Sequence, residues 1–189
     1  MATRRVGRGT LPHMRQLLLL RHAKSSWDDP KLSDHARPLN VRGRQAAGAM
    51  ARAMRELGLA PDLVLVSSAR RTLQTLEALE PWDETPLIEP MDALYLAPAI
   101  EMLEVLRQAT PVVRSLLLVG HNPGLHELAL ALAGAHAATM NEHVRRLVEG
   151  YPSGALAEFS IASPWSELRE GEAHLTRFLR PADLSGANA

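Results

Sequence analysis

The chain has 189 residues, 46% of them hydrophobic, which is enough for one domain with a core of its own. It contains no cysteine, which excludes disulfides and thiolate-bound metals and leads us to expect a cytoplasmic location. Lysine and arginine together number 21, as do aspartate and glutamate, so no net charge attracts the chain to nucleic acid or to an anionic membrane. Any basic binding site must therefore be local.

The first residues contain arginines but no long apolar segment. Residues 1–13 lack the apolar core and the cleavage site of a secretory signal, so we interpret them as a disordered arm or a leader. The strongest apolar run, residues 17–20, is far shorter than the ~20 residues that a membrane span needs. We expect a single domain over residues 14–182 and a short tail over residues 183–189.

Residues 16–20 are followed at once by Arg21 and His22. An unbroken apolar run of this kind predicts a short parallel strand that is buried on both faces of its sheet. Ligands of open α/β sheets bind beyond the carboxyl ends of the strands, so the Arg21-His22 pair is expected where such folds bind anions. The polar segment at residues 28–37 comes next and is predicted to form a loop over that crevice.

Strand and helix patterns alternate along the rest of the chain. Asn40 is predicted to cap a helix that ends near Gly58. Apolar runs predict strands at residues 63–66, 86–88 and 115–119, and helical spacing predicts helices at residues 70–79, at residues 98–108 and from Pro123 onward. Residues 155–161 and 173–179 predict two antiparallel edge strands, while residues 135–150 fit either a helix or an irregular cover. This order predicts a three-layer α/β/α sandwich with a mostly parallel central sheet.

Three polar motifs follow predicted strands. RHAKSSW occupies residues 21–27, SSARRTLQT begins at Ser67, and GHNPGL begins at Gly120. Each motif contains an arginine or a histidine, and each leaves a strand. Because three motifs in this order are far more specific than a single Arg-His pair, they indicate a common site for an anion.

The three motifs resemble those of the histidine phosphatase superfamily, whose fold is also called phosphoglycerate mutase-like. RHAKSSW is similar to the motif of its SixA-type phosphohistidine phosphatases. The resemblance extends over about residues 17–179 and includes YPSGA at residues 151–155. Arg71 matches the phosphate-binding arginine of the family, while Thr72 stands where the family usually has alanine. The resemblance implies the histidine phosphatase fold and a phosphohydrolase activity.

The family's catalytic residues correspond to four residues here. His22 would be the nucleophile, because a neutral imidazole can attack phosphorus and form a covalent phosphohistidine. Arg21 and Arg71 would bind the phosphoryl oxygens, for which a planar guanidinium that stays charged is well suited. His121, if protonated, would add a third donor to those oxygens.

The general acid is less well determined by the sequence. Many family members use a glutamate before the third helix, where this chain offers Asp92. Lys24 and Asn122 are candidates for substrate binding, although a plain surface role suits Lys24 equally well. The acids of the loop at residues 28–37, Asp34 among them, are interpreted as solvated side chains.

No motif such as His-Glu-x-x-His indicates a metal, and no other cofactor is expected. We expect a metal-independent phosphohydrolase that acts on phosphohistidine in proteins and releases inorganic phosphate. Two alternatives stay open: a phosphatase of small phosphate esters at the same site, and a catalytically idle module that binds phosphate or phosphoproteins. The intact set of Arg21, His22, Arg71 and His121 argues against the idle module.

Overall fold

The structure is a computed structural model, and it describes residues 14–134 and 141–184. In this part of the chain one sheet has the strand order β3-β2-β4-β1-β5-β6. The strands are β1 (Arg15–Arg21), β2 (Leu63–Ser67), β3 (Leu87–Met91), β4 (Ser115–Gly120), β5 (Leu156–Ile161) and β6 (Ala173–Leu179). The pairs β1–β4, β2–β4 and β2–β3 are parallel, whereas β5 pairs antiparallel with both β1 and β6. The predicted mostly parallel sheet is therefore confirmed.

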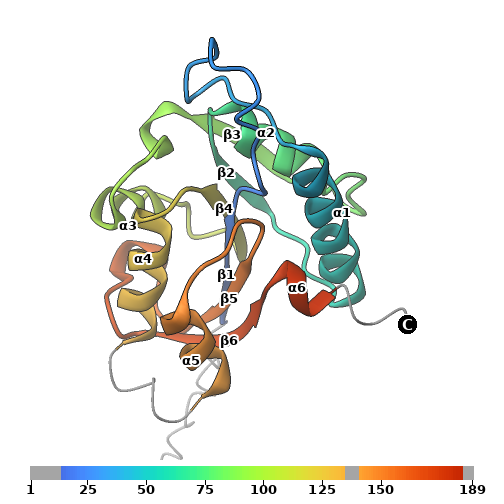
Figure 1. The fold of residues 1–189 in the computed structure, drawn as a ribbon. Coiled ribbons are helices and arrows are strands. Elements are labelled where there is room, and N and C mark those ends of the chain that lie inside the picture. Colours follow the sequence, from blue (N-terminus) through green and yellow to red (C-terminus); the bar gives the residue numbers. More distant parts are fainter. Residues whose placement is uncertain (1–13, 135–140, 185–189) are drawn as a thin grey trace, which may run out of the picture.

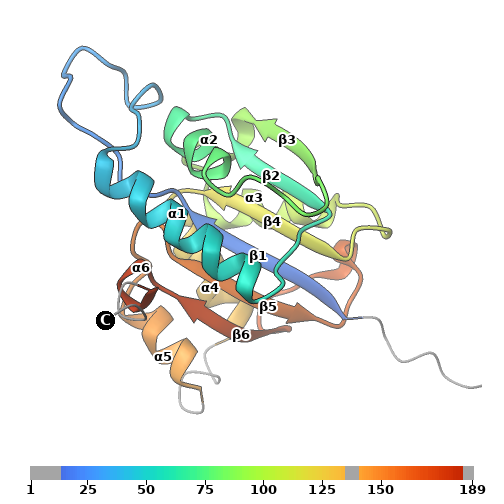
Figure 2. The ribbon, with the colours of Figure 1, turned by 90° about the vertical axis from the view of Figure 1, so that its right-hand side faces the viewer.

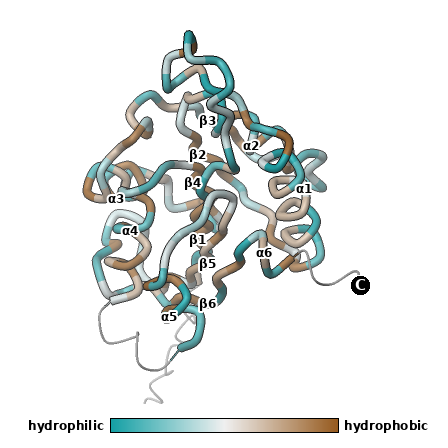
Figure 3. Tube along the Cα trace, in the orientation of Figure 1, coloured by the Kyte–Doolittle hydropathy of each residue, from teal (hydrophilic) through white to brown (hydrophobic). Residues whose placement is uncertain are grey.

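Helices cover both faces of this sheet (Figure 1). One face carries α1 (Val41–Glu56), α2 (Arg70–Glu77) and α6 (Pro181–Leu184), and the other carries α3 (Ala99–Arg107), α4 (Gly124–Ala133) and α5 (Glu142–Glu149). Each face has its own large hydrophobic cluster between helices and strands. Figure 3 shows hydrophobic residues along the central strands and a mostly hydrophilic loop between β1 and α1. The three-layer sandwich predicted from the sequence is confirmed.

β1 and β4 form the centre of the sheet. Residues 17–20 and residues 116–119 are fully buried, since helices cover both faces of these strands. Burial on both faces removes the alternation of polar and apolar residues that a half-exposed strand would show. The unbroken leucine runs are therefore the sequence signature of these two strands.

The prediction of two edge strands is wrong for β5, which lies between β1 and β6. Its polar residue Glu158 suggested exposure. In the structure the Glu158 carboxylate instead accepts a hydrogen bond from Gln16 Nε2 at 2.8 Å and pairs with Arg177 at 2.6 Å. Polar side chains that bond to neighbouring strands thus made an interior strand resemble an edge.

The observed helix boundaries agree closely with those predicted from the sequence. Asn40 caps α1, because its side-chain oxygen accepts a hydrogen bond from Gly43 N at 2.8 Å. Residues 142–149 of the undecided segment form α5, while residues 135–140 lie outside the described residues, as do residues 1–13. The proposed division into arm, domain and tail stays a prediction. Within the ranges that the structure describes, no helix is long and apolar enough to cross a membrane.

Candidate active site

The candidate site lies where β1, β2 and β4 end. Arg21 at the end of β1 is paired with Gly120 at the end of β4. The next residues, His22 and His121, therefore leave the sheet side by side, and their ring centroids are 5.2 Å apart. Arg71 reaches the two rings from the first turn of α2. The loop between β1 and α1 lies beyond these strand ends (Figure 2).

His22 is fixed in one tautomer. Its Nδ1 lies 2.7 Å from the carbonyl oxygen of Ala23, and because a carbonyl only accepts, Nδ1 carries the hydrogen. Nε2 therefore keeps its lone pair, which accepts a hydrogen bond from Arg71 Nε at 3.3 Å. Burial, together with the positive charges of Arg71 and Arg21, lowers the pKa of His22 to about 4. The imidazole is thus neutral, with a nucleophilic nitrogen facing a guanidinium.

The guanidinium of Arg71 joins three segments of the chain. The Arg71 side chain is only 4% exposed, and besides His22 it contacts His121, where its NH2 group lies 3.3 Å from Nδ1. Its other contacts are to Asp34: NH1 donates to the backbone oxygen at 2.6 Å, and NH2 donates to Oδ2 at 3.0 Å. All three guanidinium nitrogens are therefore engaged.

His121 is also neutral. Because Nδ1 accepts from Arg71, the hydrogen is on Nε2, which donates to Ser67 Oγ at 2.7 Å. Burial is the main cause that lowers the pKa of His121 to about 3, and the positive charge of Arg71 acts in the same direction. The protonated His121 expected as a donor is therefore not the state that these surroundings favour. A phosphoryl dianion beside the ring would favour protonation.

Arg21 and Asn122 are anchored on one carbonyl group. The oxygen of Tyr151 accepts from Arg21 NH1 at 2.8 Å and from Asn122 Nδ2 at 3.1 Å. Tyr151 is itself held in the core, where its hydroxyl donates to the carbonyl oxygen of Leu19 at 2.5 Å. Arg21 and Asn122 both line a cavity of about 570 Å³ beside the strand ends. Burial and the positive charge of Arg71 lower the pKa of Arg21.

Two of the predicted site residues are not brought into this cluster. The side chain of Lys24 is exposed, and it makes no hydrogen bond or ion pair with the described residues. Asp92 is exposed at the start of a short 3-10 helix, η1 (Asp92–Leu94), and its side chain likewise makes no hydrogen bond or ion pair with the described residues. Tyr95, directly after this helix, turns toward His121 instead, with ring centroids 5.5 Å apart.

Asp34 is exposed to solvent, as the sequence interpretation has it, but it is also bound to the site, which that interpretation did not include. In addition to Arg71, its carboxylate pairs with Arg37 at 2.8 Å and accepts a hydrogen bond from the Tyr95 hydroxyl at 2.7 Å. The Tyr95 hydrogen bond and the two arginines lower the pKa of Asp34 to about 2. Neither Asp34 nor Tyr95 carries a periodic signal, because each lies in a loop. Their only sequence indication is that their loops follow strands β1 and β3.

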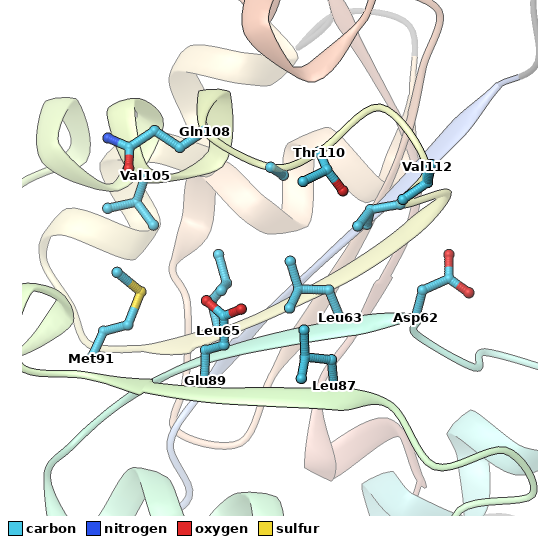
Figure 4. A pocket seen from close by; sticks show the side chains of 12 residues that line it. Asp62, Leu63, Leu65, Leu87, Glu89, Met91, Val105, Gln108, Thr110 and Val112 are labelled. Atoms are coloured by element: carbon cyan, nitrogen blue, oxygen red, sulfur yellow. The ribbon is translucent and has the colours of Figure 1, made fainter.

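A second cavity, of about 420 Å³, lies between α3 and strands β2 and β3 (Figure 4). Its lining is mostly apolar and contains no arginine or histidine. The carboxylate of Asp62 at one end is already bonded to the backbone N–H groups of Arg114 and Ser115, at 2.7 and 2.9 Å. This cavity offers no cation to a phosphoryl group, so the candidate site for phosphoryl binding is the one at the strand ends.

The arrangement at the strand ends suits phosphoryl chemistry. A neutral nucleophilic nitrogen faces a buried guanidinium, and a second guanidinium and a second imidazole lie beside it. Such fixed donors stabilise the charge that spreads over phosphoryl oxygens in a transition state. No group of three or more metal-ligating side chains is found within residues 14–134 and 141–184.

Comparison with known proteins places this geometry in a family. The model of the histidine phosphatase superfamily, branch 1, matches residues 17–92. An uncharacterised chloroplast protein of Arabidopsis thaliana is 35% identical over 167 residues, which cover 83% of this chain and 76% of that protein.

Two solved structures of candidate SixA phosphohistidine phosphatases are also similar. The protein from Nakamurella multipartitia has a TM-score of 0.77 and 28% identity, covering 89% of this chain and 96% of its own. The protein from Agrobacterium tumefaciens has a TM-score of 0.76 and 30% identity, covering 88% of this chain and 98% of its own. The resemblance to the SixA type is therefore confirmed, and the chain belongs to branch 1 of the histidine phosphatase superfamily.

Proposed function

We propose that this protein is a phosphohydrolase that works through a phosphohistidine at His22. The observation that carries the proposal is the tautomer of His22, whose Nε2 lone pair faces the guanidinium of Arg71. A neutral imidazole presented in this way is a competent nucleophile toward phosphorus. Arg71, Arg21 and His121 would bind the phosphoryl oxygens during the transfer.

The reaction has two steps. In the first, the lone pair of His22 Nε2 forms a bond to phosphorus, and the bond from phosphorus to the leaving atom breaks with its electrons going to that atom. In the second, a water oxygen attacks phosphorus and loses a proton to solvent, while the electrons of the P–N bond return to Nε2 and inorganic phosphate leaves. Nδ1 keeps its hydrogen throughout, and the Ala23 carbonyl stabilises the positive charge of the phosphorylated ring.

The substrate proposed is phosphohistidine on a protein. The alcohol that leaves a phosphate ester needs a proton from an acid, but Asp34, the carboxyl that contacts Arg71, has a pKa of about 2 and is ionised at neutral pH. The second ring nitrogen of a phosphohistidine takes a proton from solvent, so the imidazole leaves as a neutral molecule and needs no such donor. The structural similarity to candidate phosphohistidine phosphatases supports the same substrate class.

Three substrates measured side by side test this proposal. We expect kcat/KM to be highest for a phosphorylated histidine-containing protein domain, intermediate for phosphoramidate and lowest for a panel of sugar phosphates. Phosphoramidate has the labile P–N bond but offers no docking surface. A sugar phosphate hydrolysed fastest would make the enzyme a small-ester phosphatase. Tight phosphate binding without turnover of any substrate would make the protein an idle binding module.

Several sequence-based expectations stay predictions. These are the metal independence of the reaction, the cytoplasmic location, the role of Asp92 as general acid, and the roles of Lys24 and Asn122 in substrate binding. The exposed position of Asp92 gives it no contact through which to protonate a leaving group in this structure. The location needs direct measurement, since the Arabidopsis relative is described as chloroplastic.

A further inference from the structure

Asp34 binds the guanidinium of Arg71, which is the group that a phosphoryl anion would need. Its backbone oxygen accepts from Arg71 NH1 at 2.6 Å, and its Oδ2 accepts from Arg71 NH2 at 3.0 Å. A guanidinium has five N–H donors, and these contacts, together with those to His22 and His121, engage four of them. One NH1 hydrogen is left, so a phosphoryl group on His22 Nε2 can bind Arg71 with two hydrogen bonds only by taking over a donor that Asp34 or a histidine holds.

The Asp34 side chain is an anion at any working pH. The hydrogen bond from Tyr95 and the charges of Arg71 and Arg37 keep its pKa near 2, far below neutrality. A phosphoryl group and the Asp34 carboxylate therefore carry charges of the same sign, and both would bind the same guanidinium. Two like charges on one cation repel each other, so binding of one weakens binding of the other.

Asp34 can leave Arg71 without losing every partner. Its other oxygen, Oδ1, pairs with Arg37 NH1 at 2.8 Å, and the Tyr95 hydroxyl donates to Oδ2 at 2.7 Å. Arg37 is itself fixed, because it donates to the backbone oxygen of Ser26 at 2.9 Å and to Ser25 Oγ at 2.7 Å. The Asp34 side chain is 43% exposed, which leaves it room to turn, whereas that of Arg71 is 4% exposed.

We propose that Asp34 is an exchangeable internal anion that competes with phosphate for Arg71 and thereby promotes product release. The proposal rests on the proposed function, because it assumes that phosphoryl groups bind at Arg71. In the cycle, the phosphoryl group displaces the Asp34 carboxylate toward Arg37. After hydrolysis the carboxylate returns to Arg71 and weakens the hold of the site on inorganic phosphate. No bond is made or broken in this exchange apart from hydrogen bonds and ion pairs.

Calorimetric titration with inorganic phosphate tests the proposal without requiring turnover. Asp34→Asn removes the charge and keeps the shape, and Asp34→Ala removes the whole carboxylate. The matched control is Asp29→Asn in the same loop, because Asp29 is exposed and, among the residues that the structure describes, its carboxylate accepts only the backbone N–H of Lys31, at 2.9 Å. All three variants change the net charge by the same amount.

Both Asp34 variants should bind phosphate at least about fivefold more tightly than the Asp29→Asn control, the order expected for loss of one competing charge. Any smaller gain, or weaker binding, overturns the proposal. If Asp34 only oriented Arg71, its loss would weaken phosphate binding. If it were a general acid, phosphate affinity would stay the same and kcat would fall most for poor leaving groups. Absence of phosphate binding by the parent protein and by both Asp34 variants would instead refute the proposed function itself.

Discussion

Arg71 is a buried cation that is stabilised by contacts from three separate segments. It reaches His22 after β1, His121 after β4 and Asp34 in the loop before α1. Burying a charge costs free energy unless the charge is paired and hydrogen-bonded, and Asp34 provides the pairing here. Burial is the main cause that keeps both histidines neutral, and the positive guanidinium at 3.3 Å from each ring acts in the same direction, because it disfavours a second positive charge.

The depressed pKa of His22 predicts a loss of stability in acid. Its pKa falls from 6.5 to about 4 in the folded protein, so between these pH values the unfolded chain binds more protons than the folded one. The free energy of unfolding should therefore fall as the pH drops below 6.5, with a contribution from His22 of at most about 3 kcal/mol once the pH is below 4.

Urea unfolding at about pH 7 and at about pH 5 measures this effect. The His22→Gln variant is the control, because it keeps a polar side chain of similar length but cannot titrate. Between these two pH values the free energy of unfolding should fall more for the parent protein than for His22→Gln. The difference between the two free energies should therefore become smaller in acid. An equal loss in both proteins would mean that His22 is not held neutral by the fold.

Local sequence signals account for part of the site. His22 and His121 directly follow strands β1 and β4, and Arg71 lies in the first turn of the helix that comes after β2; the parallel sheet brings such positions to one edge. Asp34 and Tyr95 reach the same point through loops, whose paths depend on tertiary hydrogen bonds rather than on periodicity. The sequence therefore did not distinguish Asp34 from the solvated acids of its loop, nor Tyr95 from the neighbouring Asp92.

At the level of elements, the start of α1 fixes the segment that follows His22. Asn40 N donates to the carbonyl oxygen of Lys24 at 3.0 Å, and Gly43 packs directly against that carbonyl. A Cβ at residue 43 would lie 2.1 Å from the Lys24 oxygen, a distance that requires the backbone to move. The glycine is therefore needed for close approach of the helix to the site segment.

Two glycine substitutions in the same helix should have opposite effects. Gly43→Ala should destabilise the protein by about 1–3 kcal/mol through overpacking and should also lower kcat/KM by moving the segment after His22. Gly48→Ala should stabilise it by about 0.5–1 kcal/mol, because the nearest atom to the new Cβ is a flexible arginine tip at 3.9 Å and alanine favours the helix. Thermal unfolding of both variants checks this. A stable, active Gly43→Ala variant would show that the contact with Lys24 is dispensable.

The sequence signals were clearest for the central strands, which are buried on both faces, and for the capped helix α1. Strands β1 and β4 were apparent from their leucine runs, and helix α1 from its cap and its turn at Gly58, which has a φ of 66°. Periodicity failed for β5, whose polar residues bond across the sheet. It also left α5 undecided, because this helix of 8 residues buries only Val144 and Leu147, which are too few to define a period.

At the level of the whole molecule, the site lies at a switch point of the sheet. β1 and β4 are neighbours, yet the chain leaves β1 toward α1 on one face and leaves β4 toward α4 on the other (Figure 1). Where two connections diverge in this way, a crevice opens beyond the carboxyl ends of the strands. His22 and His121 are the first residues of these two connections, so the topology itself places them there.

Trapping of the phosphorylated enzyme tests the central claim most directly. The protein is mixed with phosphoramidate, quenched in alkali to preserve P–N bonds, digested and analysed by mass spectrometry, with His22→Ala treated in parallel. The mechanism predicts one phosphoryl group on His22 of the parent protein, with no modified peptide and no turnover in the variant, because the nucleophile is gone. Turnover by His22→Ala at the parent rate, or a phosphoryl group on another residue, would contradict it.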